Sequence, residues 1–425
     1  MTRKAIWHPF TQHGLGEPIP LVTHASGAAL FTEDGRRIVD AISSWWVVTH
    51  GHCTPRIVAA IGEQAQKLDQ LIFAGWTHQP AEDVAAALVP MVAAELGSDA
   101  LPHLFFSDSG STCVEVALKM ALGHFVHRGE GHRSRLLVME HSYHGDTIGT
   151  MSVGERGVYN APYAPLLFDV TVIPFPHEGA HQATYDALEA ACAKGDVAAF
   201  IVEPLVLGAG GMLFYPPAVL AEMARICAAH GVLFIADEVM TGFGRTGTFT
   251  ACQQAGVVPD ILCLAKGLTG GHLPLAVTMA SAAIYDSHYA PDRAKTFYHS
   301  SSYTANPIAC AAAVANLAIW REEPVAQRIA ALASAQAAGA ARLAATPGIG
   351  GVRTCGTILA LDYEVAGAGY LSGLQPRLLA FFREAGFLIR PLGNTAYLLP
   401  PYAITAEDLS AAHALLAEAA ALVQG

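Results

Sequence analysis

The sequence predicts an α/β protein with a mostly parallel central sheet in a large domain, joined to a smaller α+β domain built from both ends of the chain. Three observations indicate this fold. Short apolar runs alternate with amphipathic stretches in the middle of the chain, 425 residues exceed one ordinary domain, and the pattern changes after about Glu322. Strands that alternate with helices form parallel sheets, whose ligands bind at the carboxyl ends of the strands.

The expected strands of the large domain are short, apolar and buried. They span residues 104–106, 136–139, 199–202, 232–236 and 261–265. Apolar residues between them recur with the spacing of one helical face, as at Val114, Ala117, Leu118 and Ala121. A similar pattern begins at Val219, and we expect Gly231 to end that helix. Strands and helices therefore alternate, as a parallel sheet requires.

Three ranges follow from the changes in pattern. We expect residues 1–43 to form the N-terminal part of the small domain, 44–322 the large domain and 323–425 the C-terminal part of the small domain. Within the first range, two short strands are expected at 27–31 and 38–40 around a turn of Glu33, Asp34 and Gly35.

The composition is unusually apolar and poor in charge. Apolar residues make up 52% and charged residues 14% of the chain, against about 45–50% and about 25% in typical soluble domains. Residues 267–285 and 300–320 contain no Asp, Glu, Lys or Arg. Their glycines, prolines and polar side chains oppose a membrane span, and residues 1–14 lack the apolar core of a signal peptide. We therefore expect a cytoplasmic protein.

Charge and cysteine spacing exclude two further classes. The net charge is −12 and no basic cluster interrupts it, which opposes nucleic-acid binding. The eight cysteines form no CxxC pair, so we expect reduced thiols and no metal site.

Polar residues follow the predicted strands at four places. Residues 107–111 form a Ser/Gly loop before a helix expected from about Thr112, which suits an anion or an ordinary helix cap. Asp237 and Glu238 end a buried strand, where carboxylates need a partner such as a cation or a metal ion.

The other two places are Lys266, after the strand at 261–265, and the loop 142–146, which carries Tyr143, His144 and Asp146. A buried lysine changes its pKa readily and suits Schiff-base chemistry, although a lysine reaching the surface is the simpler interpretation. An anion cup, a carboxylate, a lysine and an aromatic ring at neighbouring strand ends are together what pyridoxal phosphate needs.

At this point the chain resembles the class III pyridoxal-phosphate aminotransferases of fold type I over nearly its whole length. The most specific signature is the segment at 234–247, which contains Asp237 and is followed by Lys266 at the family's spacing of 29 residues. A regulatory protein descended from such enzymes would be expected to lack that lysine. A racemase or decarboxylase on the same scaffold is disfavoured by the motifs.

The resemblance implies roles for the cofactor-binding and catalytic residues. Lys266 would bind pyridoxal phosphate as a Schiff base and then move a proton. Asp237 would pair with the ring nitrogen, Tyr143 would stack on the ring, and Gly110 and Ser111 would hold the phosphate. Ser302 matches a position that reaches the phosphate from the other subunit, which implies a homodimer with shared active sites. Substrate-binding positions are also implied, namely Trp45, Asp146, Ser301 and Arg390, the last as a carboxylate clamp.

Shorter motifs resemble family members that transfer the amino group of S-adenosylmethionine to 8-amino-7-oxononanoate in biotin biosynthesis, giving 7,8-diaminononanoate. They lie at residues 7–11, 43–46, 50–52, 143–147 and 389–393.

Four positions depart from that pattern. Phe10 stands where a tyrosine is usual, Ser300 and Ser301 replace a Gly-Pro pair, and Leu207 replaces a glutamine. Lysine-using relatives share the motifs at 9–12 and 302–306, whereas Trp45 favours the adenosylmethionine type. A lysine donor, or an ω-aminotransferase with another amine and keto acceptor, are the alternatives.

Overall fold

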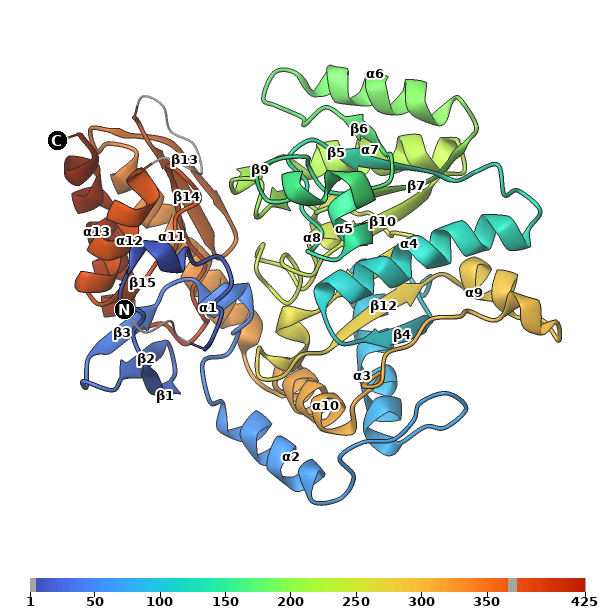
Figure 1. Ribbon diagram of the computed structural model, residues 1–425, viewed down its shortest axis with the longest axis horizontal. Coiled ribbons are helices and arrows are strands. Elements are labelled where there is room, and N and C mark those ends of the chain that lie inside the picture. The colour runs from blue at the N-terminus through green and yellow to red at the C-terminus, as the bar shows by residue number, and fades with distance from the viewer. Residues whose placement is uncertain (1–4, 366–372, 425) are drawn as a thin grey trace.

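The computed structural model describes residues 5–365 and 373–424, so the ends of two of the predicted ranges, at residues 1–4 and 425, lie outside it. The chain forms a large lobe around one sheet and a small lobe that contains described residues from both terminal parts of the chain (Figure 1). The sheet of the large lobe has the strand order β4 (His103–Ser107), β12 (Ala276–Ala280), β11 (Ile261–Leu264), β10 (Leu233–Asp237), β7 (Val197–Val202), β5 (Arg135–Met139) and β6 (Thr171–Ile173).

Every strand predicted for the large lobe is present, and the prediction of a mostly parallel sheet is confirmed. Strand β12 alone among the described strands of this sheet runs antiparallel to its neighbours β11 and β4. The sequence did not predict β12. Only residues 265–275 separate it from β11, which is too short for the crossover that a parallel pair needs.

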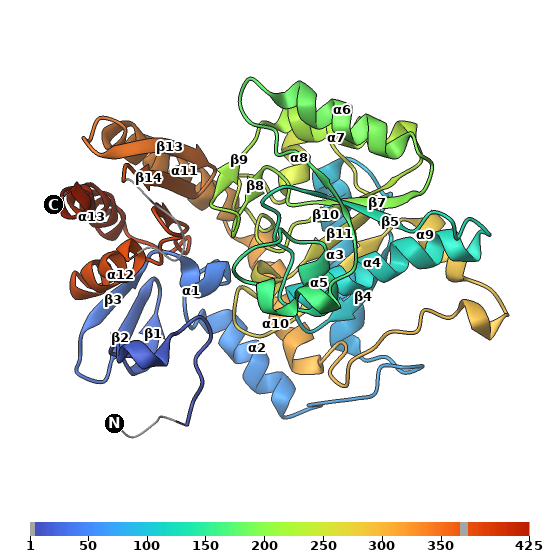
Figure 2. The same cartoon turned by 45° about the horizontal axis from the view of Figure 1, so that its top comes forward.

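Helices cover both faces of this sheet (Figure 2). Alternate strand residues form two apolar clusters, one with α4 (Gly110–His127) and α9 (Ala282–His288), the other with α3 (Gln79–Leu96), α6 (His181–Cys192) and α7 (Pro217–Ala229). Gly231 follows α7 with φ 60°, the left-handed conformation that glycine tolerates best after a helix. Helix α10 (Pro307–Glu322) packs against α3 and carries the chain toward the small lobe.

Short elements connect these layers. They are α1 (Ser43–Trp46), α2 (Pro55–Ala65), α5 (Ile148–Ser152), α8 (Ala251–Ala255), β8 (Val206–Leu207), β9 (Leu213–Phe214) and the 3₁₀ turns η1 (His13–Leu15), η2 (Ala161–Leu166), η3 (Lys266–Thr269) and η4 (Arg293–Lys295).

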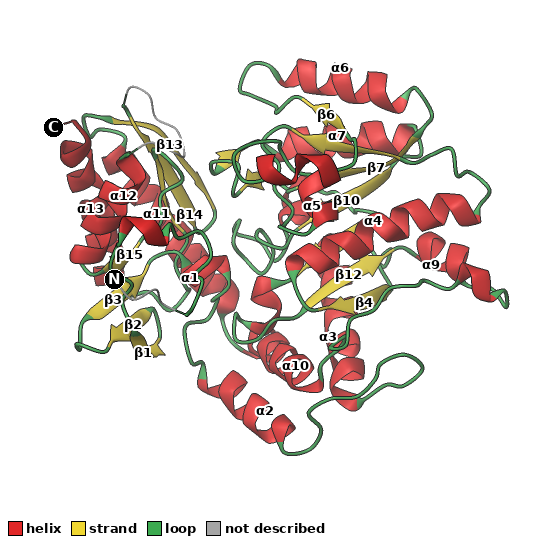
Figure 3. Ribbon diagram, viewed as in Figure 1, coloured by secondary structure: helices red, strands yellow, loops and turns green. Residues whose placement is uncertain are grey.

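The small lobe joins distant parts of the chain (Figure 3). Strands β1 (Val22–Ser26), β2 (Ala29–Thr32) and β3 (Arg37–Asp40) form one sheet with β15 (Phe387–Leu388), which pairs in parallel with β3. A second sheet contains β13 (Ile349–Cys355), β14 (Ile358–Tyr363) and β16 (Thr395–Leu398), and the helices are α11 (Val325–Leu343), α12 (Leu374–Glu384) and α13 (Ala406–Gln424). This pairing supports a small domain built from both ends, and its boundaries stay a prediction.

The two uncharged stretches lie largely inside the large lobe. All five residues of β12 are buried, and so is most of α10. The low charge of these stretches is therefore explained in part by burial within a single chain. Among the described residues, no helix is long and apolar enough to cross a membrane.

Candidate active site

Five of the predicted residues line one cavity of about 420 Å³ at the carboxyl ends of the parallel strands. They are Gly110, Ser111, Tyr143, Asp237 and Lys266. Each follows or ends a different strand or opens the helix after it, as expected for ligand sites of parallel sheets. The fold thus brings together residues that are up to 156 positions apart in the sequence.

Lys266 follows β11 and opens the turn η3 with φ 40°, an unusual conformation for a residue with a side chain. Burial lowers the pKa of its amine to about 8, although Asp237 and Glu203 favour the charged form. Its Nζ lies 5.4 Å from the ring centroid of Trp46. Because a neutral amine is the nucleophile, this environment raises the reactive fraction of Lys266 near neutral pH.

Asp237 ends β10 and is 5% exposed. Its Oδ2 is 2.6 Å from Nδ1 of buried His144, and its Oδ1 accepts a hydrogen bond from the backbone N–H of Val239 at 3.1 Å. An ionised carboxylate can only accept, so the His144 imidazole donates. His144 fixes the direction of the Asp237 carboxylate. The sequence analysis noted this histidine in its motif and gave it no role.

Glu238 faces away from the cavity, although it is adjacent to Asp237 in the sequence. Its carboxylate accepts hydrogen bonds from Thr241 Oγ1 and from the backbone N–H groups of Ala251 and Cys252, at the start of α8. Successive strand residues point to opposite faces, so only one of the two carboxylates can reach the cavity.

The helix cap is present in the loop before α4, and the same loop lines the cavity. The Ser109 side chain caps the helix with Thr112, and Gly110 and Ser111 form its first turn, two residues earlier than predicted. A Cβ on Gly110 would lie 2.6 Å from Val239 Cγ1, so glycine lets the backbone approach the cavity wall closely. The start of an 18-residue helix favours negative charge.

Tyr143 lies on the loop after β5. Burial raises the pKa of its phenol well above its usual value, and the nearby Asp146 adds to the shift. The backbone N–H of Tyr143 donates to Glu203 Oε1 at 2.9 Å, while Glu203 Oε2 accepts from the N–H of Gly208 at 3.0 Å. Burial raises the pKa of Glu203 to about 7. The sequence analysis missed this residue, although it follows β7 just as Lys266 follows β11.

A second group of predicted residues does not line this cavity, and two of them, Phe10 and Arg390, line another cavity of about 880 Å³. Arg390 Nη2 donates to the carbonyl oxygen of Phe10 at 3.1 Å, and its guanidinium lies 5.5 Å from the ring centroid of Trp45. The rings of Phe10 and Trp45 are 5.3 Å apart. Trp45 does not line the 420 Å³ cavity, but the next residue in the sequence, Trp46, does. Asp146 is exposed, and its backbone N–H donates to Ser111 Oγ at 3.3 Å.

The tryptophan segment has a strained backbone that buried groups hold in place. Ser43, Ser44 and Trp46 all have positive φ. The buried Asp40 carboxylate accepts from the backbone N–H and hydroxyl of Ser44 at 2.7 and 2.9 Å. Arg245 of the signature segment, 1% exposed, donates to the carbonyl oxygen of Trp46 at 3.3 Å. These contacts set the position of both tryptophans.

Ser301 and Ser302 differ in their relation to the cavity of their own chain. The Ser301 hydroxyl donates to the carboxylate of Asp108, which lines the cavity. The Ser302 carbonyl oxygen accepts from the side-chain amide of Gln70, and Ser302 is not among the residues that line the cavity. One chain alone therefore does not bring Ser302 to this site.

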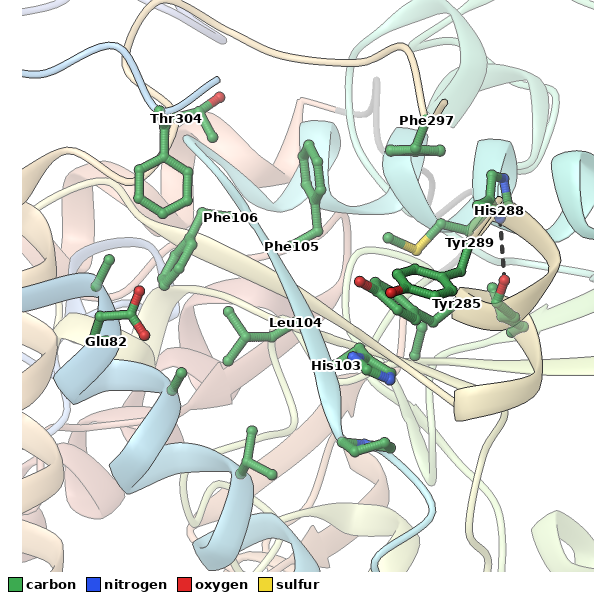
Figure 4. Close-up of a pocket in the computed structure, with 18 residues that line it drawn as sticks. Glu82, His103, Leu104, Phe105, Phe106, Tyr285, His288, Tyr289, Phe297 and Thr304 are labelled. Carbon is green, nitrogen blue, oxygen red and sulfur yellow. Dashed lines mark hydrogen bonds between the residues drawn. The ribbon is translucent and has the colours of Figure 1, made fainter. Parts of the chain in front are cut away.

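Another cavity, of about 510 Å³, lies along the edge strand β4 and is mainly apolar (Figure 4). Its labelled rings include Phe105, Phe297, Tyr285 and Tyr289, and His103 stacks on Tyr285 at 3.8 Å between centroids. Lys266 and Asp237 do not line it.

Comparisons with known proteins identify relatives of this chain. Adenosylmethionine-8-amino-7-oxononanoate aminotransferase of Synechococcus elongatus is 47% identical, covering 97% of each chain. The crystal structure of the protein of that name from Methanocaldococcus jannaschii has a TM-score of 0.93 at 32% identity, covering 99% of this chain and 97% of that one. An amine transaminase from an uncultivated Pseudomonas species, solved in its PLP-bound form, has a TM-score of 0.92 at 32% identity, covering 99% of each chain.

The family profile "Aminotransferase class-III" matches residues 11–420. The predicted fold type and enzyme class are confirmed by these matches, and so is pyridoxal phosphate as the cofactor of the family. The chain therefore belongs to the class-III aminotransferases.

Proposed function

We propose that this protein transfers the amino group of S-adenosylmethionine to 8-amino-7-oxononanoate and forms 7,8-diaminononanoate, a step of biotin biosynthesis. The observation that carries the proposal is the 47% identity, over nearly the whole chain, to a relative named for these two substrates. The cavity that contains Lys266 and Asp237 supports the aminotransferase chemistry.

The residues of the 420 Å³ cavity fit pyridoxal phosphate. The α4 N-terminus at Gly110 and Ser111 suits a phosphate group, and the space there excludes a Cβ on Gly110. The Asp237 carboxylate suits a protonated pyridine nitrogen, and the Lys266 amine suits an aldehyde. Tyr143 supplies an aromatic ring to cover one face of the cofactor.

When bound, pyridoxal phosphate supplies an electron sink for the carbon that loses or gains the amino group. Asp237, oriented by His144, holds a proton on the ring nitrogen and so maintains that sink. Lys266 Nζ would take up and release the proton that moves during amino transfer. Its pKa of about 8 lies close enough to neutral pH for it to do both. Donor and acceptor would use this site in turn.

The second group of residues would bind the oxononanoate. Arg390 would hold its carboxylate, and Trp45 would pack against its apolar chain. Asp146 and Ser301, near the rim of the cavity, would contact the polar ends of the substrates.

We also infer a homodimer in which Ser302 of the partner subunit reaches the phosphate. Several exposed aromatic side chains support a surface that the partner subunit would cover. They are Trp76 at 67%, Tyr298 at 67% and Tyr303 at 62% exposure. The apolar cavity beside edge strand β4 adds to this surface (Figure 4). Obligate dimers cover apolar areas of about 2,000–5,000 Å². The cytoplasmic location stays a prediction.

The amino donor is tested by a half-reaction without acceptor. The holoenzyme is mixed separately with S-adenosylmethionine, lysine or a simple arylalkylamine, and the loss of the visible cofactor absorbance is followed. Of the three amines, we expect only S-adenosylmethionine to remove the visible cofactor absorbance. If lysine alone does so, the lysine-dependent alternative holds; if only the simple amine does, the protein is an ω-aminotransferase.

Replacing Arg390 by alanine is expected to raise the KM for 8-amino-7-oxononanoate, because a hydrogen bond to a charged group contributes about 1.5–3 kcal/mol, or roughly 10- to 100-fold in binding. The KM for the amino donor and kcat should change little. Arg377→Ala, which removes an exposed arginine from α12, is the matched control. An unchanged acceptor KM in the Arg390 variant would remove this residue from the substrate site.

A further inference from the structure

The backbone at Lys266 is strained and closely packed. A residue with a side chain at φ 40° persists only where its surroundings hold it. A Cβ on Gly267 would lie 2.7 Å from Phe243 Cβ, and one on Gly271 would lie 2.5 Å from the Val47 carbonyl oxygen. Packing therefore encloses the turn η3 and the residues just after it on two sides, and within this segment the Gly267 carbonyl oxygen accepts from the Gly270 N–H at 3.0 Å.

Helix α10 also binds this turn, through Asn316. The Asn316 side chain is fully buried in a helix whose neighbouring residues are Ala315 and Leu317. Its Nδ2 donates to the carbonyl oxygens of Gly267 at 2.9 Å and Leu268 at 3.0 Å. Carbonyl oxygens only accept, so the NH₂ group must face the turn. One amide thus binds the two peptide groups that directly follow Lys266.

The other side of this amide lies next to His50. Burial lowers the pKa of His50 to about 4, and Asn316 opposes this shift, so the imidazole beside the amide is neutral at working pH. The rings of Trp320 and Tyr402 each lie 6.0 Å from the His50 ring. These rings pack around His50, whereas Asn316 Oδ1 is buried without a hydrogen-bond partner among the described residues, so the two bonds of Nδ2 to the turn are the ones that orient the amide.

We propose that Asn316 is a positioning residue for the aminotransferase reaction. Its amide holds the strained turn η3 against α10 and so fixes the direction of Lys266 Nζ and its exclusion from solvent. The inference rests on the proposed role of Lys266 as the amine that binds the cofactor. Without the two hydrogen bonds, the turn relaxes and Nζ gains contact with water.

The test compares Asn316→Leu and Asn316→Ala with Gln336→Leu in the full-length holoenzyme. Leucine has the same branched skeleton as asparagine with bulkier δ groups and keeps water out, whereas alanine leaves space for a water molecule that can replace the donors. Gln336 is the matched control, because it is an equally buried amide whose Nε2 donates to the Thr357 carbonyl at 3.0 Å in the small lobe.

Four quantities are measured for each variant. They are the urea midpoint of unfolding, kcat and KM, the pH dependence of the visible cofactor absorbance, and the pH dependence of acetylation of Lys266 by acetic anhydride in the cofactor-free chain, read by peptide mass spectrometry. For the wild-type chain, acetylation should be half-maximal near pH 8, following the pKa of Lys266. This last readout does not depend on enzyme activity.

In Asn316→Leu we expect kcat to fall at least 10-fold with KM within about threefold, and half-maximal acetylation to move to higher pH, because solvent access restores the charged form. Asn316→Ala should show the smaller effect of the two, and it serves as the test if the leucine variant does not fold. Gln336→Leu should lower the urea midpoint without moving either pH profile.

Two results would contradict the proposals, one the role of Asn316 and the other the proposed function. If the Asn316 variants lose stability as the control does and keep the wild-type kcat and pH profiles, Asn316 is only structural and the inference is wrong. If the wild-type chain shows no cofactor attached at Lys266 after borohydride reduction, the proposed function fails instead.

Discussion

Replacing Lys266 by alanine is expected to abolish transamination, with kcat lower by about 10⁴-fold or more, because one change removes both the covalent attachment and the group that moves the proton. Nothing else that lines the cavity carries an amine. The protein should still fold, since burial disfavours the charged form of Lys266 and alanine leaves no charge to bury. The measurement is the steady-state rate of 7,8-diaminononanoate formation, together with borohydride reduction and peptide mass spectrometry.

After borohydride reduction, the wild-type peptide that contains Lys266 should carry the cofactor and the variant should carry none. Lys194→Ala is the control, because this lysine is exposed at the end of α6, on a different part of the large lobe. Wild-type turnover in the Lys266 variant would contradict the assignment. Cofactor fixed to another lysine in the wild-type chain would contradict it equally.

Changing Asp237 to asparagine should lower kcat by about 10²-fold or more, since an amide of nearly the same shape cannot hold a proton on the ring nitrogen by charge. The hydrogen bond between His144 Nδ1 and Asp237 Oδ2 can be kept by the amide oxygen, so the cavity should retain its shape. Both half-reactions should slow, because both need the same electron sink. Stopped-flow absorbance measures each half-reaction separately.

Asp260→Asn is the matched control for this change. Asp260 is also a largely buried carboxylate next to the same sheet, and its Oδ2 accepts from the Phe234 N–H at 2.8 Å. Because it precedes β11, it lies at the amino ends of the parallel strands, opposite the cavity. Burial raises its pKa, whereas nothing connects it to the cavity. Equal losses in the two variants would mean that Asp237 acts through the stability of the sheet and not through the cofactor.

The site residues that end or follow predicted strands could be predicted from the sequence, because the carboxyl ends of parallel strands lie side by side in a sheet. Lys266, Asp237, Tyr143, Gly110 and Ser111 all line the same cavity, as their positions after apolar runs suggested. Glu203 follows the strand β7 in the same way, and a single glutamate after an apolar run was overlooked because no recognisable motif surrounds it.

The spacing of apolar residues does not specify the direction of a strand in the sheet. It also does not specify which buried polar groups form hydrogen bonds with each other. The antiparallel strand β12 lies within an uncharged stretch whose sequence pattern does not distinguish a strand from another buried segment. Its pairing with β11 and β4 in the structure shows that it is a strand. The pairs His144 with Asp237 and Asn316 with Gly267 join residues 93 and 49 positions apart. Contacts of that range depend on how whole elements pack.

The sequence by itself determined the fold class, the family, the cofactor and five of the residues that line the cavity, because these follow from local patterns of apolar and polar residues and from one specific signature. Only the tertiary structure decided that Glu238 turns away, that His144 orients Asp237, and that Asn316 binds the turn after the reactive lysine. The physical reason is that burial and hydrogen-bond partners are set by three-dimensional packing, and these in turn control the pKa and direction of each reactive group.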